Sequence, residues 1–273
     1  MNSKITGKWH GKRYDYEDNE RSTVKELSNS LKALSRDYNV VGIKQSFEDE
    51  GAILSDVVTM RRITELSDLK MYVKIGGCEA ITDINNCVSN SIDAIIAPMV
   101  ETEYAFKKFI SAVKNIKKTD FHFLCETITA YDNINEILAT KEASHLSGVI
   151  VGRSDFTKSH GLDKSHVDSP PICKKVKEIF EKSKKMGLVT TMGGNISVNS
   201  KEFIKDLYSN NLLDKIETRN IVVELDDDNV SNLEETISAI LEYEILWLNF
   251  KAQNYESISR SYKERIETLK DRT

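Results

Sequence analysis

Short runs of apolar and β-branched residues alternate along the chain with amphipathic segments. Most runs are near-continuously apolar, as expected of strands that are covered on both faces. Successive runs begin about 30 residues apart on average, which is the length of one βα unit. The runs are "VVGIKQSF" at Val40, "KMYVKIGG" at Lys70, "DAIIAPMVE" at Asp93, "FHFLCET" at Phe121, "GVIVGRSD" at Gly148, "LVTTMGG" at Leu188 and "KIETRNIVVEL" at Lys215.

Repeated βα units leave two architectures, a closed (β/α)8 barrel or an open doubly wound sheet. We predict the α/β class, and the pattern alone leaves both the (β/α)8 TIM barrel and the open sheet open. Seven strand signals are clear and an eighth is not. We therefore expect an atypical or missing first strand near the N-terminus.

The two ends of the chain differ from this pattern. Residues 1–20 have no clear period and predict an N-terminal arm, which is followed by a helical stripe from Val24 to Leu34. Residues 231–273 contain no helix breaker up to Leu269 and predict a long C-terminal helical extension. Its second half is highly charged around a narrow apolar stripe, which favours contact with another subunit in a homo-oligomer, with a frayed tail as the alternative. We expect one barrel domain over residues 1–273, since no linker divides it.

Composition excludes several classes of function. The chain has 273 residues and a net charge of -5, which argues against a nucleic-acid partner. No apolar stretch approaches the length of a membrane span, so we expect no membrane partner. The four cysteines are widely spaced without a CxxC pair, which favours reduced thiols and a cytoplasmic location.

The candidate chemistry lies where the predicted strands end, because the site of an α/β barrel forms at the carboxyl ends of its strands. Glycines there let backbone N–H groups approach an anion, and paired carboxylates suit Mg²⁺ or Mn²⁺. Each feature alone also fits a turn, a helix cap or a solvated loop, but their coincidence favours a site. The residues at these ends are Lys44, Glu48, Glu50, Lys74, Gly76, Gly77, Glu126, Gly152, Arg153, Ser154, Asp155, Gly193 and Gly194.

Two of these strand ends carry a family resemblance. "CETITAYDNINEIL" and "GVIVGRSDFTKSHG" resemble consecutive motifs of the HpcH/HpaI aldolase and citrate lyase β-subunit family. "IIAPMVET" and "VVGIKQSFEDEGA" resemble earlier strand ends of the same family, so the resemblance covers roughly residues 40–225. It implies a (β/α)8 barrel that makes or breaks C–C bonds beside a 2-oxo acid, or acts on an acyl thioester. It further implies a Mg²⁺ or Mn²⁺ ion held by Glu126 and Asp155, and oligomers that share C-terminal helices.

The resemblance also assigns the remaining roles. Lys74 stands where the family has an arginine at the substrate oxygen, and a lysine there supplies a point charge without the bidentate fork. No histidine lies near "FEDEG", where one branch of the family has its general base, so Glu48 or Glu50 is expected to move the proton. The expected substrate-binding residues are Gly76, Gly77, Gly152, Arg153, Ser154 and Gly193.

Two other functions stay open at this point. Lys44 or Lys74 at a strand end could form a Schiff base in a metal-free aldolase. The replaced arginine and missing histidine also fit a non-catalytic descendant of the fold that binds a small molecule or acts as a scaffold.

Overall fold

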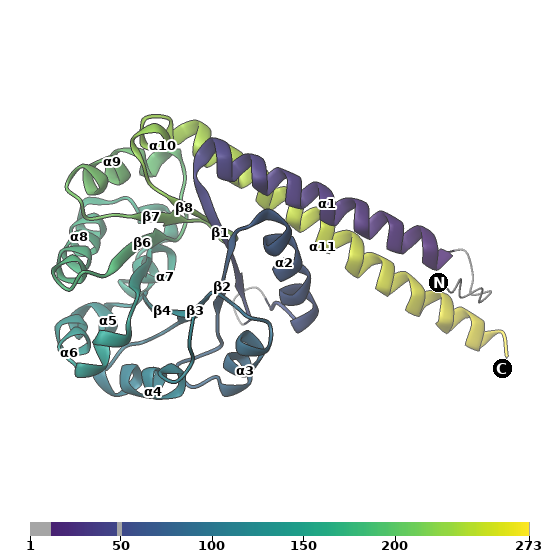
Figure 1. Cartoon of the computed structure of the whole chain (residues 1–273), viewed down its shortest axis with the longest axis horizontal. Helices are drawn as coiled ribbons and strands as arrows, with labels where there is room; N and C mark the ends of the chain where they lie inside the picture. Colours follow the sequence, from purple (N-terminus) through teal and green to yellow (C-terminus); the bar gives the residue numbers. More distant parts are fainter. Residues whose placement is uncertain (1–11, 48–50, 273) are drawn as a thin grey trace.

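The computed structural model describes residues 12–47 and 51–272. At its centre is a closed eight-stranded barrel, in which each strand pairs with the next and the last pairs with the first (Figure 1). This confirms the barrel and excludes the open sheet. The strands are β1 (Val40–Ser46), β2 (Lys70–Lys74), β3 (Ala94–Ala97), β4 (Asp120–Cys125), β5 (Gly148–Gly152), β6 (Val189–Gly193), β7 (Lys215–Glu217) and β8 (Ile221–Glu224).

Helices connect successive strands from β1 to β7 and surround the barrel (Figure 1). Three short 3-10 turns, at Lys141–His145, Lys164–His166 and Val198–Ser200, lie in these connections. The connecting helices are α2 (Leu54–Ser67), α3 (Ile81–Ser89), α4 (Glu103–Val113), α5 (Ile128–Asp132), α6 (Ile134–Leu138), α7 (Arg153–Ser159), α8 (Pro170–Lys185) and α9 (Lys201–Ser209).

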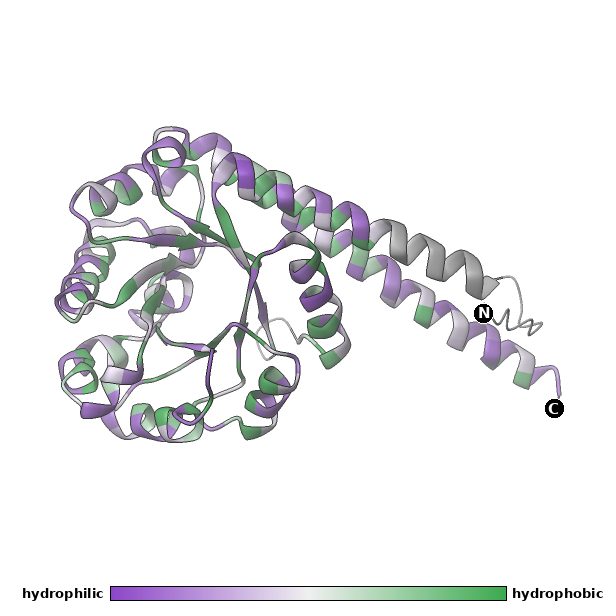
Figure 2. Cartoon of the chain, in the orientation of Figure 1, coloured by the Kyte–Doolittle hydropathy of each residue, from purple (hydrophilic) through white to green (hydrophobic). Residues whose placement is uncertain are grey.

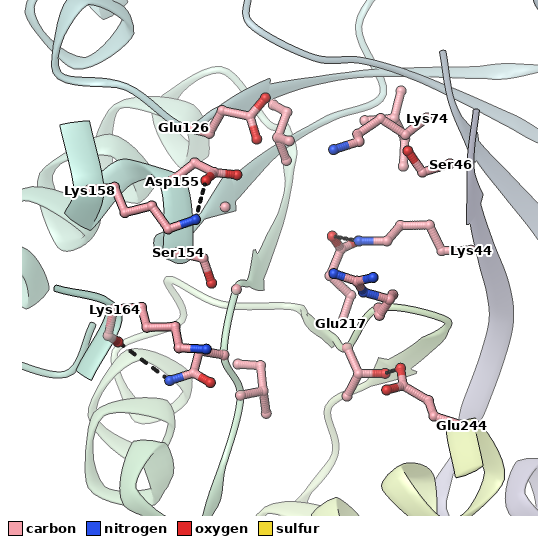
Figure 3. A pocket seen from close by; sticks show the side chains of 18 of the residues that line it. Lys44, Ser46, Lys74, Glu126, Ser154, Asp155, Lys158, Lys164, Glu217 and Glu244 are labelled. Carbon is pink, nitrogen blue, oxygen red and sulfur yellow. Dashed lines mark hydrogen bonds and ion pairs between the residues drawn. The ribbon is translucent and has the colours of Figure 1, made fainter. Parts of the chain in front are cut away.

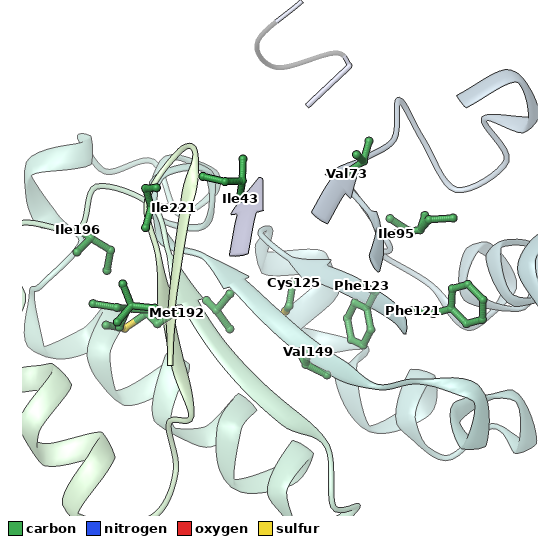
Figure 4. Close-up of a cluster of buried hydrophobic side chains, with 14 of the residues drawn as sticks. Ile43, Val73, Ile95, Phe121, Phe123, Cys125, Val149, Met192, Ile196 and Ile221 are labelled. Carbon is green, nitrogen blue, oxygen red and sulfur yellow. The ribbon is translucent and has the colours of Figure 1, made fainter. Parts of the chain in front are cut away.

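The hydrophobic core has two parts because successive strand residues point to opposite faces. Outward-facing side chains such as Val73, Ile95 and Phe123 pack under the helices (Figure 4). A smaller cluster, which includes Ile96 and Leu124, fills the inside of the barrel. Each fully buried side chain of this size stabilises the fold by about 1.5–3 kcal/mol, so burial on both faces holds the strand ends in place.

The irregular strand is the last one, not the first. The sequence predicted one strand in the run at Lys215, but the structure divides this run into β7 and β8. Strand β8 is antiparallel to both β7 and β1, whereas the other strand pairs are parallel. Only residues 218–220 join β7 to β8, and so short a connection cannot return the chain for a parallel pairing. The three-residue spacing was the signal for this hairpin that the sequence interpretation missed.

Helix α1 (Lys12–Tyr38) includes the second half of the arm predicted over residues 1–20. Residues 12–20 are helical, and residues 1–11 lie outside the described part of the chain. The predicted stripe is confirmed, since Leu27 and Leu31 are buried. The apolar spacing before Val24 is too weak to mark the start of the helix.

Helix α11 (Leu233–Lys270) follows the short α10 (Asp227–Ser231) and lies within the segment expected to be a helical extension. It runs beside α1, and the pair projects away from the barrel (Figure 1). Trp247 in α11 is buried, whereas hydrophilic residues dominate the outer part of this helix (Figure 2). A subunit contact through this helix stays a prediction. Each helix in the described residues is too short or too polar to span a bilayer.

Replacing Gly148 with alanine is expected to lower the free energy of unfolding by about 1–3 kcal/mol through overpacking. A Cβ atom there would lie 2.5 Å from the carbonyl oxygen of Val189 and 2.8 Å from Nδ1 of His122. The nearer of these two atoms belongs to the backbone of β6, which cannot move aside as a flexible side chain could. Gly77→Ala is the matched control, because nothing lies within 4 Å of a Cβ at Gly77. Urea unfolding compares the two variants, and equal stability would contradict the barrel packing described here.

Candidate active site

A cavity of about 420 Å³ opens at the carboxyl ends of the barrel strands (Figure 3). Its size exceeds that of a three-carbon acid, so it has room for a second substrate group. Charged side chains of both signs line it, including Lys44, Lys74, Glu126, Asp155, Glu217 and Glu244. These come from β1, β2, the ends of β4 and β5, β7 and α11.

Glu126 and Asp155 lie on one wall of the cavity (Figure 3). Glu126 follows the last residue of β4, and Asp155 lies in the first turn of α7, directly after β5. Glu126 is only 2% exposed, and its Oε1 accepts a hydrogen bond of 3.1 Å from the backbone N–H of Met99. Asp155 is partly exposed and forms an ion pair of 3.1 Å with Lys158. The structure thus brings the two predicted metal ligands to one cavity.

Gly152 makes room for Glu126, since a Cβ at Gly152 would lie 3.2 Å from its Oε2. The glycine also lines the cavity, as does Ser154. Of the predicted substrate-binding residues, these two lie where a ligand could reach them.

Burial raises the pKa of Glu126 to about 7. The positive charge of Lys74 and the N–H of Met99 oppose this rise in pKa, whereas the nearby charge of Asp155 adds to it. The carboxyl group is therefore half protonated near neutral pH unless a cation replaces the proton.

The donor set fits a hard divalent cation. Mg²⁺ and Mn²⁺ prefer carboxylate oxygens and keep several water ligands. Glu126 and Asp155 would supply two protein oxygens, and a cation would remove the electrostatic penalty of the buried Glu126 carboxylate. No group of three His, Cys, Asp or Glu side chains forms a fuller metal centre within residues 12–47 and 51–272. Water and substrate oxygens would therefore complete the coordination.

Lys74, Lys44 and Glu217 occupy the opposite wall (Figure 3). The Lys44 ammonium group forms an ion pair with the Glu217 carboxylate. No role was predicted for Glu217 from the sequence. Its only signal was an acidic residue at the end of a short apolar run, and the run was read as one longer strand.

The predicted anion site at Gly76 and Gly77 is not supported by the structure. Neither glycine lines the cavity with Lys74. The N–H of Gly76 donates a 2.7 Å hydrogen bond to Asp83 Oδ2 in α3, and the carbonyl of Gly77 accepts one from Ala80. The two residues form the turn into α3, and these two backbone groups are engaged within it.

The second Gly-Gly pair, Gly193 and Gly194, leaves room for neighbouring atoms that a side chain would displace. Gly193 is buried, and a Cβ there would lie 2.8 Å from Cγ of Glu217. Gly194 lines the cavity instead, with a positive φ of 79°. A Cβ on Gly194 would lie 2.5 Å from the backbone nitrogen of Arg153. Gly193 therefore makes space for an acidic side chain rather than binding substrate directly.

Arg153 is a structural residue in the fold, which corrects its assignment as a substrate-binding cation. Its side chain is fully buried and forms an ion pair with Asp168. It also donates hydrogen bonds to Ser200 Oγ at 3.1 Å and to the carbonyl of Gly193 at 3.3 Å. Since these partners surround the guanidinium group, it joins α7 to the end of β6 from behind the cavity.

Glu48 and Glu50, the predicted proton-transfer residues, lie outside the described residues. Their role stays a prediction.

Comparison with known proteins identifies the fold. No protein-family model matches the sequence, and neither does any curated protein. An HpcH/HpaI aldolase/citrate lyase family protein from Burkholderia cenocepacia J2315 superposes with a TM-score of 0.56 at 14% identity, over 80% of this chain and 90% of that one. The chain has the HpcH/HpaI aldolase and citrate lyase fold.

Two further solved structures share this fold. Citrate synthase SbnG gives a TM-score of 0.55 at 14% identity, over 81% of this chain and 90% of that one. An HpcH/HpaI aldolase from Desulfitobacterium hafniense DCB-2 gives 0.51 at 11% identity, over 60% and 73%. The fold implied by the sequence motifs is therefore confirmed.

Proposed function

We propose that this protein is a divalent-metal-dependent lyase that cleaves or forms a C–C bond in a 2-oxo acid or a related acyl thioester. The observation that carries the proposal is the buried Glu126 beside Asp155, facing Lys74 across a cavity at the carboxyl end of the barrel. The names of the similar structures, aldolase, citrate lyase family protein and citrate synthase, support the reaction class by analogy of fold.

Glu126 and Asp155 would hold Mg²⁺ or Mn²⁺. When bound, the metal supplies Lewis-acid stabilisation of negative charge on a 2-oxo acid. Lys74 adds a positive charge from the opposite wall, which favours a substrate carboxylate or a developing negative oxygen. The ion pair with Lys158 restrains Asp155 at the mouth of the cavity. The metal held by Glu126 and Asp155, together with Lys74, would therefore stabilise the enolate charge that C–C cleavage beside a carbonyl creates.

Calorimetric titration with Mg²⁺ and Mn²⁺, with and without oxalate, tests the proposal. Oxalate is a planar mimic of the pyruvate enolate. We expect oxalate to bind the wild-type protein only with metal, and we expect Asp155→Asn to weaken this binding at least tenfold. The variant keeps the size of the side chain but removes the charge that attracts the metal. Lys164→Gln is a matched control, since Lys164 lines the same cavity but offers no metal ligand.

Metal-linked oxalate binding that persists in Asp155→Asn would contradict the site assignment. The absence of metal-linked binding in the wild-type protein would favour one of the two other functions.

A Schiff-base aldolase is the second candidate, because Lys44 and Lys74 both line the cavity. Lys44 would first have to leave its ion pair with Glu217. Borohydride reduction in the presence of pyruvate would add a stable mass to the reacting lysine. An unchanged mass would exclude this candidate for pyruvate. If metal-linked oxalate binding were absent as well, a non-catalytic binding protein would be the function left.

A further inference from the structure

The ion pair of Lys44 and Glu217 lies inside the cavity, away from the carboxylate pair. Its side chains are 15% and 3% exposed, respectively. Figure 3 shows the pair on the wall opposite Glu126 and Asp155, with both charged groups directed into the space between the walls. A substrate held at the carboxylate pair would therefore have the Lys44–Glu217 pair on its other side.

Contacts from three parts of the fold hold the side chains of Lys44 and Glu217 in position. Gly193 leaves the space that the side chain of Glu217 occupies, as a Cβ there would lie 2.9 Å from Oε1. The backbone N–H of Lys44 donates to the carbonyl of Asn220 at 2.8 Å, and the amide side chain of Asn220 donates to the carbonyl of Lys44 at 3.0 Å. These bonds tie β1 to the β7–β8 turn, which directly follows Glu217.

Helix α11 fixes the same turn from the outside. The Glu244 carboxylate accepts a hydrogen bond from the hydroxyl of Thr218 and another, of 2.7 Å, from the N–H of Asn220. The unusual antiparallel hairpin, the first strand and the long helix thus converge to place one lysine beside one glutamate.

Stability does not explain this arrangement. Removing two charges from water costs several kcal/mol per ion, and the attraction between them often fails to offset that cost. A buried pair that faces a cavity is better explained by chemistry on a ligand in the cavity. The pair also combines a proton donor and a proton acceptor within one hydrogen bond.

We propose that Lys44 and Glu217 transfer the proton in C–C cleavage, an inference that rests on the proposed function. The Glu217 carboxylate takes the proton from the substrate hydroxyl as the C–C bond breaks. The O–H electron pair forms the new carbonyl, and the C–C electron pair becomes the enolate. The Lys44 ammonium then gives a proton to the enolate carbon, which forms a C–H bond and leaves a neutral amine. The proton on the Glu217 carboxyl group then passes to the neutral amine of Lys44, which restores the ion pair. The net result is the transfer of one proton from the substrate hydroxyl oxygen to the enolate carbon.

Exchange of the methyl protons of pyruvate in D₂O tests the last two steps in reverse. Proton NMR follows the exchange with Mg²⁺ present, and calorimetry measures oxalate binding to the same samples. We expect Glu217→Gln and Lys44→Met each to slow exchange at least about 100-fold, the range of general acid–base catalysis. Oxalate affinity should change less than about threefold, because the metal-binding wall is intact.

Lys44→Arg separates proton transfer from charge. Arginine keeps the positive charge beside Glu217 but does not give up a proton in proteins. We expect this variant to bind oxalate and to exchange as slowly as Lys44→Met. Gly193→Ala, which places a Cβ against Glu217, should also slow exchange.

Three outcomes distinguish a failure of this inference from a failure of the proposed function. Near-wild-type exchange in both Lys44→Arg and Glu217→Gln would overturn this inference and leave the proposed function standing. A wild-type protein that binds oxalate with metal but does not exchange pyruvate protons would also overturn the inference alone. A wild-type protein without metal-linked oxalate binding would overturn the proposed function and this inference with it.

Discussion

Arg153→Ala is expected to lower the free energy of unfolding by about 3–5 kcal/mol, as expected when one partner of a buried ion pair is removed. The guanidinium group is fully buried and neutralises Asp168. Its removal would leave Asp168 without its cation, and it would leave Ser200 Oγ and the carbonyl of Gly193 without this donor. Urea unfolding followed by circular dichroism measures the loss.

Two variants control this measurement. Arg153→Lys keeps the charge but loses the planar fork that reaches several acceptors, so it should show an intermediate loss. Arg36→Ala removes an exposed arginine that pairs with its neighbour Asp37, and the urea midpoint should not change. If Arg153→Ala behaved like Arg36→Ala, the assignment of Arg153 as a structural residue would be wrong.

The affinity for Mn²⁺ is expected to rise about tenfold per pH unit below pH 7 and to level off above it. Burial raises the pKa of Glu126 to about 7, so below this pH a proton competes with the metal for the same carboxylate. The change from pH 5 to pH 7 is then about 50-fold, because the group is half ionised at its pKa. A carboxyl group with an ordinary pKa would already be ionised at pH 5.5 and would show almost no change. Calorimetric titration with Mn²⁺ at intervals of half a pH unit measures the profile.

Lys74→Met provides the matched comparison. The charge of Lys74 lowers the pKa of Glu126, so its loss should move the break in the affinity profile to higher pH. Glu126→Gln should abolish the dependence together with most of the binding. Affinity that is flat from pH 5.5 to 8 in the wild-type protein would contradict metal binding through a carboxyl group with a raised pKa, whereas metal binding that persists in Glu126→Gln would show that Glu126 does not ligate the metal.

The strand order and one wall of the cavity follow from local sequence. A strand covered on both faces needs a continuous apolar run, and the runs at Val40, Lys70 and Asp93 are such strands. Parallel neighbours end at the same edge, so residues just past β4 and β5 must lie close together. That rule put Glu126 and Asp155 among the candidates for one site, and the family resemblance selected them as the metal pair. In the structure both line one cavity.

Side-chain direction at that edge could not be predicted in the same way. Gly152, Arg153 and Ser154 follow one strand, yet Gly152 and Ser154 line the cavity whereas Arg153 points into the interior. The direction depends on where α7 begins, which the spacing of residues does not specify to a single position. The glycines were misjudged for a related reason, since Gly193 makes room for a residue distant in sequence.

Periodicity and chain order were enough to predict repeated βα units and the end of the strands that carries the site, because these features depend on short-range pattern and on strands that end together. The resemblance of two motifs to a known family then favoured the closed barrel and the pair of Glu126 and Asp155. Tertiary structure alone decided the direction of β8, the burial of Arg153 and the meeting of Lys44 with Glu217 across 173 positions of the chain. These features depend on which surfaces meet when the barrel closes. The pattern of apolar and polar residues along one segment does not show which distant segment will pack against it.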